Sequence, residues 1–189
     1  MVGMDTKAAL LDSAENAIRS RGFDGFSYAD LAAEVGIRKA SIHHHFPTKA
    51  DLALALIARY SENFFAKLDQ ISETHPTGGA RLKAYVSACR DALDGGRKLC
   101  LCVAFCTGRD GLSADVLARL DSFHRTLSAW LGEVFAAGEA DNSIADVMEC
   151  GAEAHACLAQ MEGAQLMSRA AQDAGRFDAA VARLLQRIK

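Results

Sequence analysis

The sequence predicts an all-α protein, and three observations support that fold class. The 189 residues include 36 alanines and only two prolines, and alanine is the best helix former whereas proline is the worst. Apolar residues recur at the helical spacing of three and four residues along most of the chain. The breaks between these runs all contain glycine or proline, which end helices.

About nine helices are expected, each from its apolar stripe and from the break that follows it. They cover residues 5–21, 27–34, 38–45, 48–72, 80–94, 98–107, 113–137, 144–170 and 176–188. The breaks between them are Gly22, Gly36, Phe46-Pro47, Pro76 to Gly79, Gly95-Gly96, Gly108 to Gly111, Gly138 to Asn142, and Gly175. Three helices begin at a capping box, in which a serine or threonine is followed three residues later by an aspartate. The boxes span residues 27–30, 48–51 and 143–146.

Several protein classes are excluded by composition. No run approaches the roughly 18 consecutive apolar residues that suggest a membrane span. Residues 1–7 do not read as a signal peptide, because an acid and polar residues precede the first short apolar run. We therefore expect a cytoplasmic protein without a membrane partner, whose six cysteines are thiols. The net charge of -3 gives no global indication of nucleic-acid binding, so that function has to rest on a local site.

The first four helices have the order of a helix-turn-helix. Three short helices precede a long one, and Gly36 allows a tight turn between the second and the third. The third helix would present polar side chains to DNA bases from its N-terminal half. These residues are Arg38, Lys39 and Ser41, with His43 and His44 near the end of the helix. Lys49 and the free amides at the start of the long helix suit a phosphate.

Residues 8–52 resemble the TetR/AcrR family of bacterial transcriptional repressors. The most specific part is the block from Ser41 to Leu52, SIHHHFPTKADL, which joins the end of the third helix to the start of the fourth. The resemblance implies a helix-turn-helix DNA-binding domain over residues 1–46. A helical regulatory domain that binds ligand and forms the dimer would cover residues 47–189.

The resemblance also implies which residues contact an operator in double-stranded DNA. They are Ser27, Tyr28, Arg38, Lys39, Ala40, Ser41, His43, His44 and Lys49. Two positions depart from the family, which usually has tyrosine at His43 and often glycine at Ala40. Residues 1–51 carry six Lys/Arg and seven Asp/Glu, so we expect modest non-specific affinity and a shallow salt dependence.

The second half is expected to pair two subunits and to bind an unidentified small molecule. By resemblance, the helices over 144–170 and 176–188 form a four-helix bundle with a second copy, and the homodimer reads a near-palindromic operator. The ligand would release this repressor from DNA. The candidate residues for lining the small-molecule pocket are Phe64, Leu68, Cys89, Cys102, Phe105, Cys106, His124, Leu127 and Met161. Packing in the apolar core is the alternative interpretation of each.

The cysteines permit two interpretations. On a helix, Cys100 and Cys102 lie about 200° apart, whereas Cys102 and Cys106 share a face. Cys150 and Cys157 also share a stripe, which favours a packed seam of small apolar side chains. The alternative is a redox or electrophile sensor that uses Cys102 and Cys106, which requires an exposed thiolate.

Other functions are weighed against DNA binding. Consecutive helical residues point about 100° apart, so His43, His44 and His45 cannot converge on one metal ion. No nucleophile motif indicates an enzyme, and we expect neither a metal nor another cofactor. An interaction protein that keeps the helix-turn-helix shape without using DNA stays open, because the N-terminal part has a net charge of -1.

Overall fold

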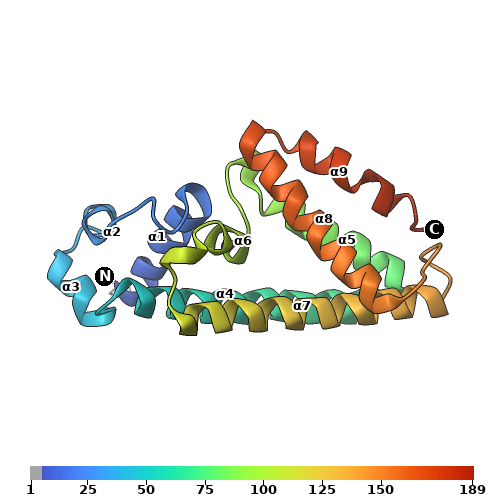
Figure 1. The fold of residues 1–189 in the computed structure, drawn as a ribbon, viewed down its shortest axis with the longest axis horizontal. Coiled ribbons are helices and arrows are strands. Elements are labelled where there is room, and N and C mark those ends of the chain that lie inside the picture. Colours follow the sequence, from blue (N-terminus) through green and yellow to red (C-terminus); the bar gives the residue numbers. More distant parts are fainter. Residues whose placement is uncertain (1–5) are drawn as a thin grey trace. The chain divides into compact units, whose positions relative to one another are not determined.

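The computed structural model describes residues 6–189, which form nine α-helices, two short 3-10 helices and no strand (Figure 1). The helices are α1 (Thr6–Arg21), α2 (Tyr28–Val35), α3 (Lys39–His45), α4 (Lys49–Thr74), α5 (Gly78–Asp91), η1 (Asp94–Gly96), α6 (Leu101–Cys106), η2 (Arg109–Gly111), α7 (Ala114–Ala140), α8 (Cys150–Ala171) and α9 (Gly175–Leu185). The all-α prediction is confirmed. Residue 5 of the first predicted helix, and residues 1–5 of the predicted DNA-binding domain, lie outside the described residues. None of the described helices combines the length and apolar character that crossing a membrane requires.

The chain folds into two compact units. Residues up to Glu62 and Leu101–Asp121 form unit 1, whereas Asn63–Cys100 and Ser122–Lys189 form unit 2. The helices α4 and α7 each contribute to both units. Unit 1 therefore contains α6, which follows much later in the chain than the helix-turn-helix.

The core of unit 1 joins α6 to the N-terminal helices. Phe105 is completely buried, and its ring centroid lies 5.2 Å from that of Phe23 in the turn between α1 and α2. Apolar side chains from the first four helices complete this core: Leu10, Ile18, Leu31, Ile42, Leu52, Leu56 and Ile57. All seven are almost inaccessible to solvent, so the short helices owe their stability to tertiary packing.

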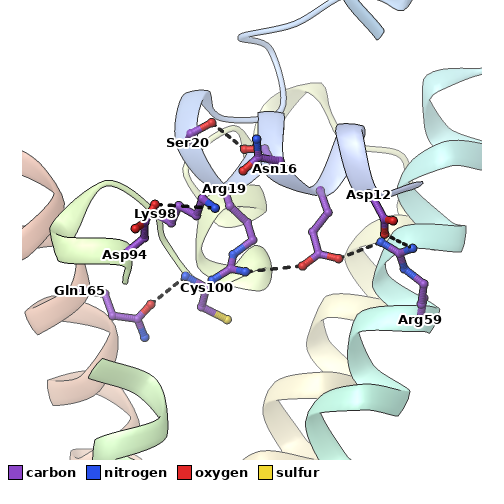
Figure 2. A network of polar contacts seen from close by, with 10 residues as sticks. Asp12, Asn16, Arg19, Ser20, Arg59, Asp94, Lys98, Cys100 and Gln165 are labelled. Carbon is purple, nitrogen blue, oxygen red and sulfur yellow. Dashed lines mark hydrogen bonds and ion pairs between the residues drawn. The ribbon is translucent and has the colours of Figure 1, made fainter. Parts of the chain in front are cut away.

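A salt bridge fixes the first half of α4 to α1 inside unit 1. Arg59 on α4 donates one hydrogen bond to Asp12 Oδ1 at 2.7 Å (Figure 2) and another to Glu15 Oε2 at 3.0 Å. Glu15 also pairs with Arg19, one turn along α1, at 3.5 Å. One guanidinium that bonds two carboxylates on α1 restrains how α1 and this part of α4 can turn against each other.

In unit 2, two glycines let α5 and α7 approach closely. A Cβ atom built on Gly78 would collide with the backbone of Gly138 and would lie 2.6 Å from the Val134 carbonyl oxygen. The backbone N–H of Gly78 donates to Asp141 Oδ2 at 2.9 Å, directly after α7. The side chain of Thr77 accepts from the Ala80 N–H and caps the start of α5.

The capping box predicted at residues 143–146 is wrong. The helix begins only at Cys150, and the side chain of Glu149 caps it by accepting from the N–H groups of Gly151 and Ala152. Ile144 instead forms an isolated antiparallel bridge with Ile188 and is buried. Asp146 has a φ of 56°, which is left-handed and interrupts any helix there. Burial of Ile144 against the C-terminal segment therefore outweighs the local capping signal.

The predicted helix over 98–107 is shorter than expected. It begins at Leu101, because the Cys100 N–H donates to Gln165 Oε1 of α8 at 2.8 Å (Figure 2). Cys100 therefore precedes the helix, and its predicted position opposite Cys102 on a helix surface does not apply.

Arg187 holds the segment before α8. It bonds both carboxylate oxygens of Glu153, at 2.7 and 2.8 Å, and also donates to the carbonyl oxygens of Ala145 and Asp146. These hydrogen bonds lower the pKa of Glu153 below its ordinary value. Four hydrogen bonds from one guanidinium tie the C-terminal segment to α8 and to the 145–146 loop.

We expect acid to weaken unit 2 through this pair. A carboxyl group with a lowered folded pKa stabilises the fold above its unfolded pKa of about 4.3, and that contribution is lost as the pH falls through the folded pKa. Glu153→Gln should therefore cost roughly 1 kcal/mol near pH 7 and nearly nothing once the wild-type carboxyl is protonated. Urea unfolding at several pH values measures the difference, with the exposed Glu133→Gln on α7 as control. An equal loss at acidic and neutral pH would contradict the assignment.

Candidate nucleic-acid interface

The turn between α2 and α3 has the geometry that a helix-turn-helix requires. Ser27 and Asp30 form the predicted capping box, with the Ser27 N–H donating to Asp30 Oδ2 at 2.7 Å. α2 ends at Gly36, which has a φ of +75° and donates its N–H to the Ala32 carbonyl at 3.0 Å. A residue with a side chain would be strained in this left-handed conformation, so Gly36 allows the tight reversal into α3.

One fully buried side chain attaches α3 to unit 1, and its polar side chains face outward. Ile42 is inaccessible to solvent. Ser41 and His45 are half-buried. The exposed residues at the start and along the outer face of α3 are Arg38, Lys39, Ala40, His43 and His44. Arg38 is the N-cap in extended conformation and makes no side-chain capping bond. This short helix therefore has the outward-facing polar surface expected of a recognition helix.

Tyr28 lies in the core rather than on the surface. Only 6% of the residue is exposed, and its hydroxyl lies 3.0 Å from the carbonyl oxygen of Phe46 and 2.7 Å from that of Thr48. Burial raises the pKa of Tyr28 to about 12, so the hydroxyl stays a donor. Tyr28 was expected among the DNA contacts, and the structure makes it a link from α2 to the α3–α4 junction.

We expect Tyr28→Phe to destabilise unit 1 by about 1–3 kcal/mol, because buried carbonyl groups would lose their donor. Chemical denaturation measures this loss. The matched control is Tyr60→Phe on α4, whose tyrosine is half-exposed. If both variants unfold at the same denaturant concentration, the Tyr28 hydroxyl does not support the junction.

The Lys49 ammonium is directed toward the α1–α2 turn. Its Nζ donates to the Phe23 carbonyl at 2.9 Å and lies 4.3 Å above the centre of the Phe26 ring and 4.8 Å above that of Phe23. Desolvation lowers the pKa of Lys49. In this arrangement Lys49 positions the start of α4. The aromatic partners are 23 and 26 residues earlier in the chain, so sequence spacing does not identify them.

The imidazole of His43 faces the α3–α4 junction. Its Nδ1 lies 3.1 Å from the Pro47 carbonyl oxygen, and its ring meets the Tyr28 ring edge-on at 5.0 Å between centroids. At the start of α4, Thr48 and Asp51 form the predicted capping box, with the Thr48 N–H donating to Asp51 Oδ2 at 2.9 Å.

A shallow groove of about 400 Å³ lies between these groups. Its lining residues are Phe26, Ser27, Tyr28, Lys39, His43, Pro47, Thr48 and Lys49. The starts of α2 and α4 and one side of α3 form its walls. Five of the nine predicted DNA contacts line it: Ser27, Tyr28, Lys39, His43 and Lys49. A groove with lysines and hydroxyl groups at two helix starts suits a phosphodiester backbone.

The predicted ligand-binding residues are divided between the two units. Cys102, Phe105 and Cys106 belong to α6 in unit 1, where the first two are fully buried and Cys106 is exposed. The other six belong to unit 2: Phe64, Leu68, Cys89, His124, Leu127 and Met161. Leu68, Leu127 and Met161 are buried. The ligand-binding role of these nine residues stays a prediction.

Aromatic and polar groups do gather within unit 2. The Phe123 ring lies 5.1 Å from Phe64 and 5.2 Å from Phe65. His124 Nε2 lies 3.0 Å from Glu162 Oε1. The Trp130 indole donates to Ser72 Oγ at 3.0 Å, a contact that no helical periodicity predicts.

Burial affects the acidity of two of the cysteine thiols. It raises the pKa of both Cys89 and Cys157 to about 12. Cys157 is buried with Ala154 and Met161, as the sequence predicts. Cys150, predicted in the same seam, is only half-buried, and its Sγ lies 3.9 Å from Glu139 Oε2. Since the thiolate is the reactive form, the thiols of Cys89 and Cys157 are poorly suited to sensing oxidants.

Comparison with known proteins identifies relatives of both parts of the chain. The family model for bacterial regulatory proteins, tetR family, matches residues 10–56. The fold as a whole is similar to the crystal structure of a transcriptional regulator, TetR family, from Agrobacterium tumefaciens. That pair is 31% identical, covers 97% of each chain and has a TM-score of 0.92.

Two curated relatives match about half of this chain. The transcriptional regulator CymR of Pseudomonas putida is 32% identical over 48% of this chain and 41% of its own length. The transcriptional repressor KstR2 of Rhodococcus jostii is 27% identical over 47% of this chain and 43% of its own length. The match therefore spans about two fifths of the length of these relatives.

Proposed function

Because the chain belongs to the TetR family of bacterial regulatory proteins, we propose that it binds operator DNA through α3 and responds to a small molecule. The observation that carries the proposal is α3 itself. Ile42 anchors the helix, Gly36 sets its entry angle, and Arg38, Lys39 and His43 are exposed beside the groove. Under this proposal, residues 1–46 bind operator DNA and residues 47–189 regulate that binding.

The proposed DNA-binding form is a homodimer through α8 and α9. Among the described residues, the large apolar side chains most exposed to solvent are Met148, Leu166 and Met167, all on or just before α8. Exposed apolar side chains of this kind favour burial against another chain. A two-fold dimer would place two copies of α3 about 34 Å apart, or a multiple of it, and would read a near-palindrome.

The proposed regulation is release of a repressor by a ligand that binds the C-terminal part. A ligand changes DNA affinity only through its different affinity for the DNA-competent and DNA-incompetent arrangements. A coupling of about 1.4–3 kcal/mol changes operator affinity by a factor of about 10–150. A chain with this function acts on the chromosome, which places it in the cytoplasm.

The test is a fluorescence-anisotropy titration of the purified, reduced protein with DNA that flanks its own gene. Saturable binding that survives an excess of unrelated duplex supports a specific regulator, and the same assay then screens ligands for release. Binding to flanking DNA no tighter than to unrelated DNA calls for selection from a random duplex library. If selection also yields no preferred sequence, the interaction-protein alternative replaces this proposal.

A further inference from the structure

His43 differs from every other group in the groove between α2, α3 and α4, because its ability to donate a hydrogen bond depends on pH. The Pro47 carbonyl oxygen can only accept, so the Nδ1 atom 3.1 Å away carries the hydrogen. The Tyr28 ring, edge-on at 5.0 Å, restrains the orientation of the imidazole. The tautomer of the neutral ring is therefore determined by its surroundings.

That tautomer has a consequence for an anion at the groove. In neutral His43 the Nε2 atom has a lone pair and accepts hydrogen bonds, so it cannot donate to a phosphate oxygen. Protonation puts a hydrogen and a positive charge on the exposed ring while the Pro47 bond is kept. Only the protonated ring offers Nε2–H to a phosphodiester.

We propose that His43 contacts the DNA backbone only in its protonated form, so that DNA binding strengthens as the pH falls through the titration of the imidazole. The inference rests on the proposed function, since it concerns the same interface. A tyrosine at this position could donate a hydrogen bond from its hydroxyl at every pH near neutrality. The histidine can donate one from Nε2 only when the ring is protonated.

The charged and titratable groups around His43 come from three elements. They are Tyr28 and Asp30 on α2, Lys39, His44 and His45 on α3, and Lys49 and Asp51 on α4. The two carboxylates are held by Ser27 and Thr48 at the helix starts. Burial keeps the Tyr28 hydroxyl neutral, with a pKa of about 12. His75 supplies the matched control, because its Nδ1 also lies 3.1 Å from a carbonyl oxygen, that of Ile71, and it does not line the groove.

The experiment measures affinity for one duplex, selected from a random library, at about pH 5.5 and about pH 8, which bracket imidazole titration. A charge-assisted hydrogen bond is worth a factor of about ten or more per half-site. The wild type and His75→Gln should therefore bind about a hundredfold more tightly at the lower pH as dimers. His43→Gln and His43→Tyr, which donate at both pH values, should bind nearly equally at both.

A second readout separates a phosphate contact from a structural effect. Each neutralised phosphate steepens the slope of log affinity against log salt by about 0.9. The wild-type slope should therefore steepen by about 0.9 per half-site on acidification, and that of His43→Gln should not. If His43→Gln keeps the wild-type pH dependence, or the wild type has none, the role of His43 is refuted while DNA binding stands. If no duplex is selected at either pH, both proposals fail.

Discussion

Replacing Arg38 and Lys39 together with alanine is expected to abolish specific DNA binding without changing the fold. Both side chains are exposed at the start of α3, where a recognition helix meets base edges. An arginine contact to a guanine is worth about 1–3 kcal/mol in each half-site, and a lysine contact adds to it. Across the two half-sites of a dimer, affinity should fall at least about a thousandfold.

The matched control removes two lysines from elsewhere on the surface. Lys67 on α4 and Lys83 on α5 are exposed and belong to unit 2. Lys67→Ala/Lys83→Ala changes the net charge equally and should reduce affinity only slightly. Anisotropy titrations at one salt concentration compare the variants, and circular dichroism checks their folding. Undiminished binding by Arg38→Ala/Lys39→Ala would mean that α3 does not read DNA.

Gly78→Ala is expected to produce the largest loss of stability in unit 2. The new methyl group would meet the backbone of Gly138 and the Val134 carbonyl oxygen, and backbone atoms cannot move aside as the end of a flexible side chain can. α5 would have to shift away from α7, which would disturb the hydrogen bond from the Gly78 N–H to Asp141. Overpacking against backbone of this kind costs roughly 3 kcal/mol.

Gly132→Ala on α7 is the control for this substitution. The nearest atom to its Cβ would be the Cys150 carbonyl oxygen at 4.0 Å, an ordinary contact distance. Since alanine favours a helix by up to about 1 kcal/mol over glycine, this variant should be neutral or more stable. Urea unfolding followed by circular dichroism measures both changes. A Gly78→Ala protein as stable as the wild type would show that α5 and α7 do not need this close approach.

The three predicted capping boxes show where sequence reasoning succeeds and where it fails. The boxes that begin at Ser27 and Thr48 form as predicted, and each helix starts within one residue of the expected position. The third box, beginning at Ser143, has the same pattern but does not form, because Ile144 is buried against the C-terminal segment. A capping box stabilises a helix by about 1 kcal/mol, comparable to or less than the burial of an isoleucine side chain.

The same contrast between local and long-range interactions applies to the predicted DNA-binding surface. The exposure of Arg38, Lys39 and His43 follows from their helical spacing relative to the buried Ile42. The different orientations of Tyr28 and Lys49 do not, because both depend on partners about twenty residues away or more.

By itself the sequence determined the helical class, the glycine turn before α3 and the polar face of that helix, because backbone propensity, capping and periodicity act over a few neighbouring residues. The tertiary structure alone decided that α6 packs into unit 1, that Lys49 and Tyr28 support the α3–α4 junction, and that Ile144 pairs with Ile188. These contacts join residues distant along the chain. Their free energy comes from burial and hydrogen bonds that exist only when the whole unit is assembled.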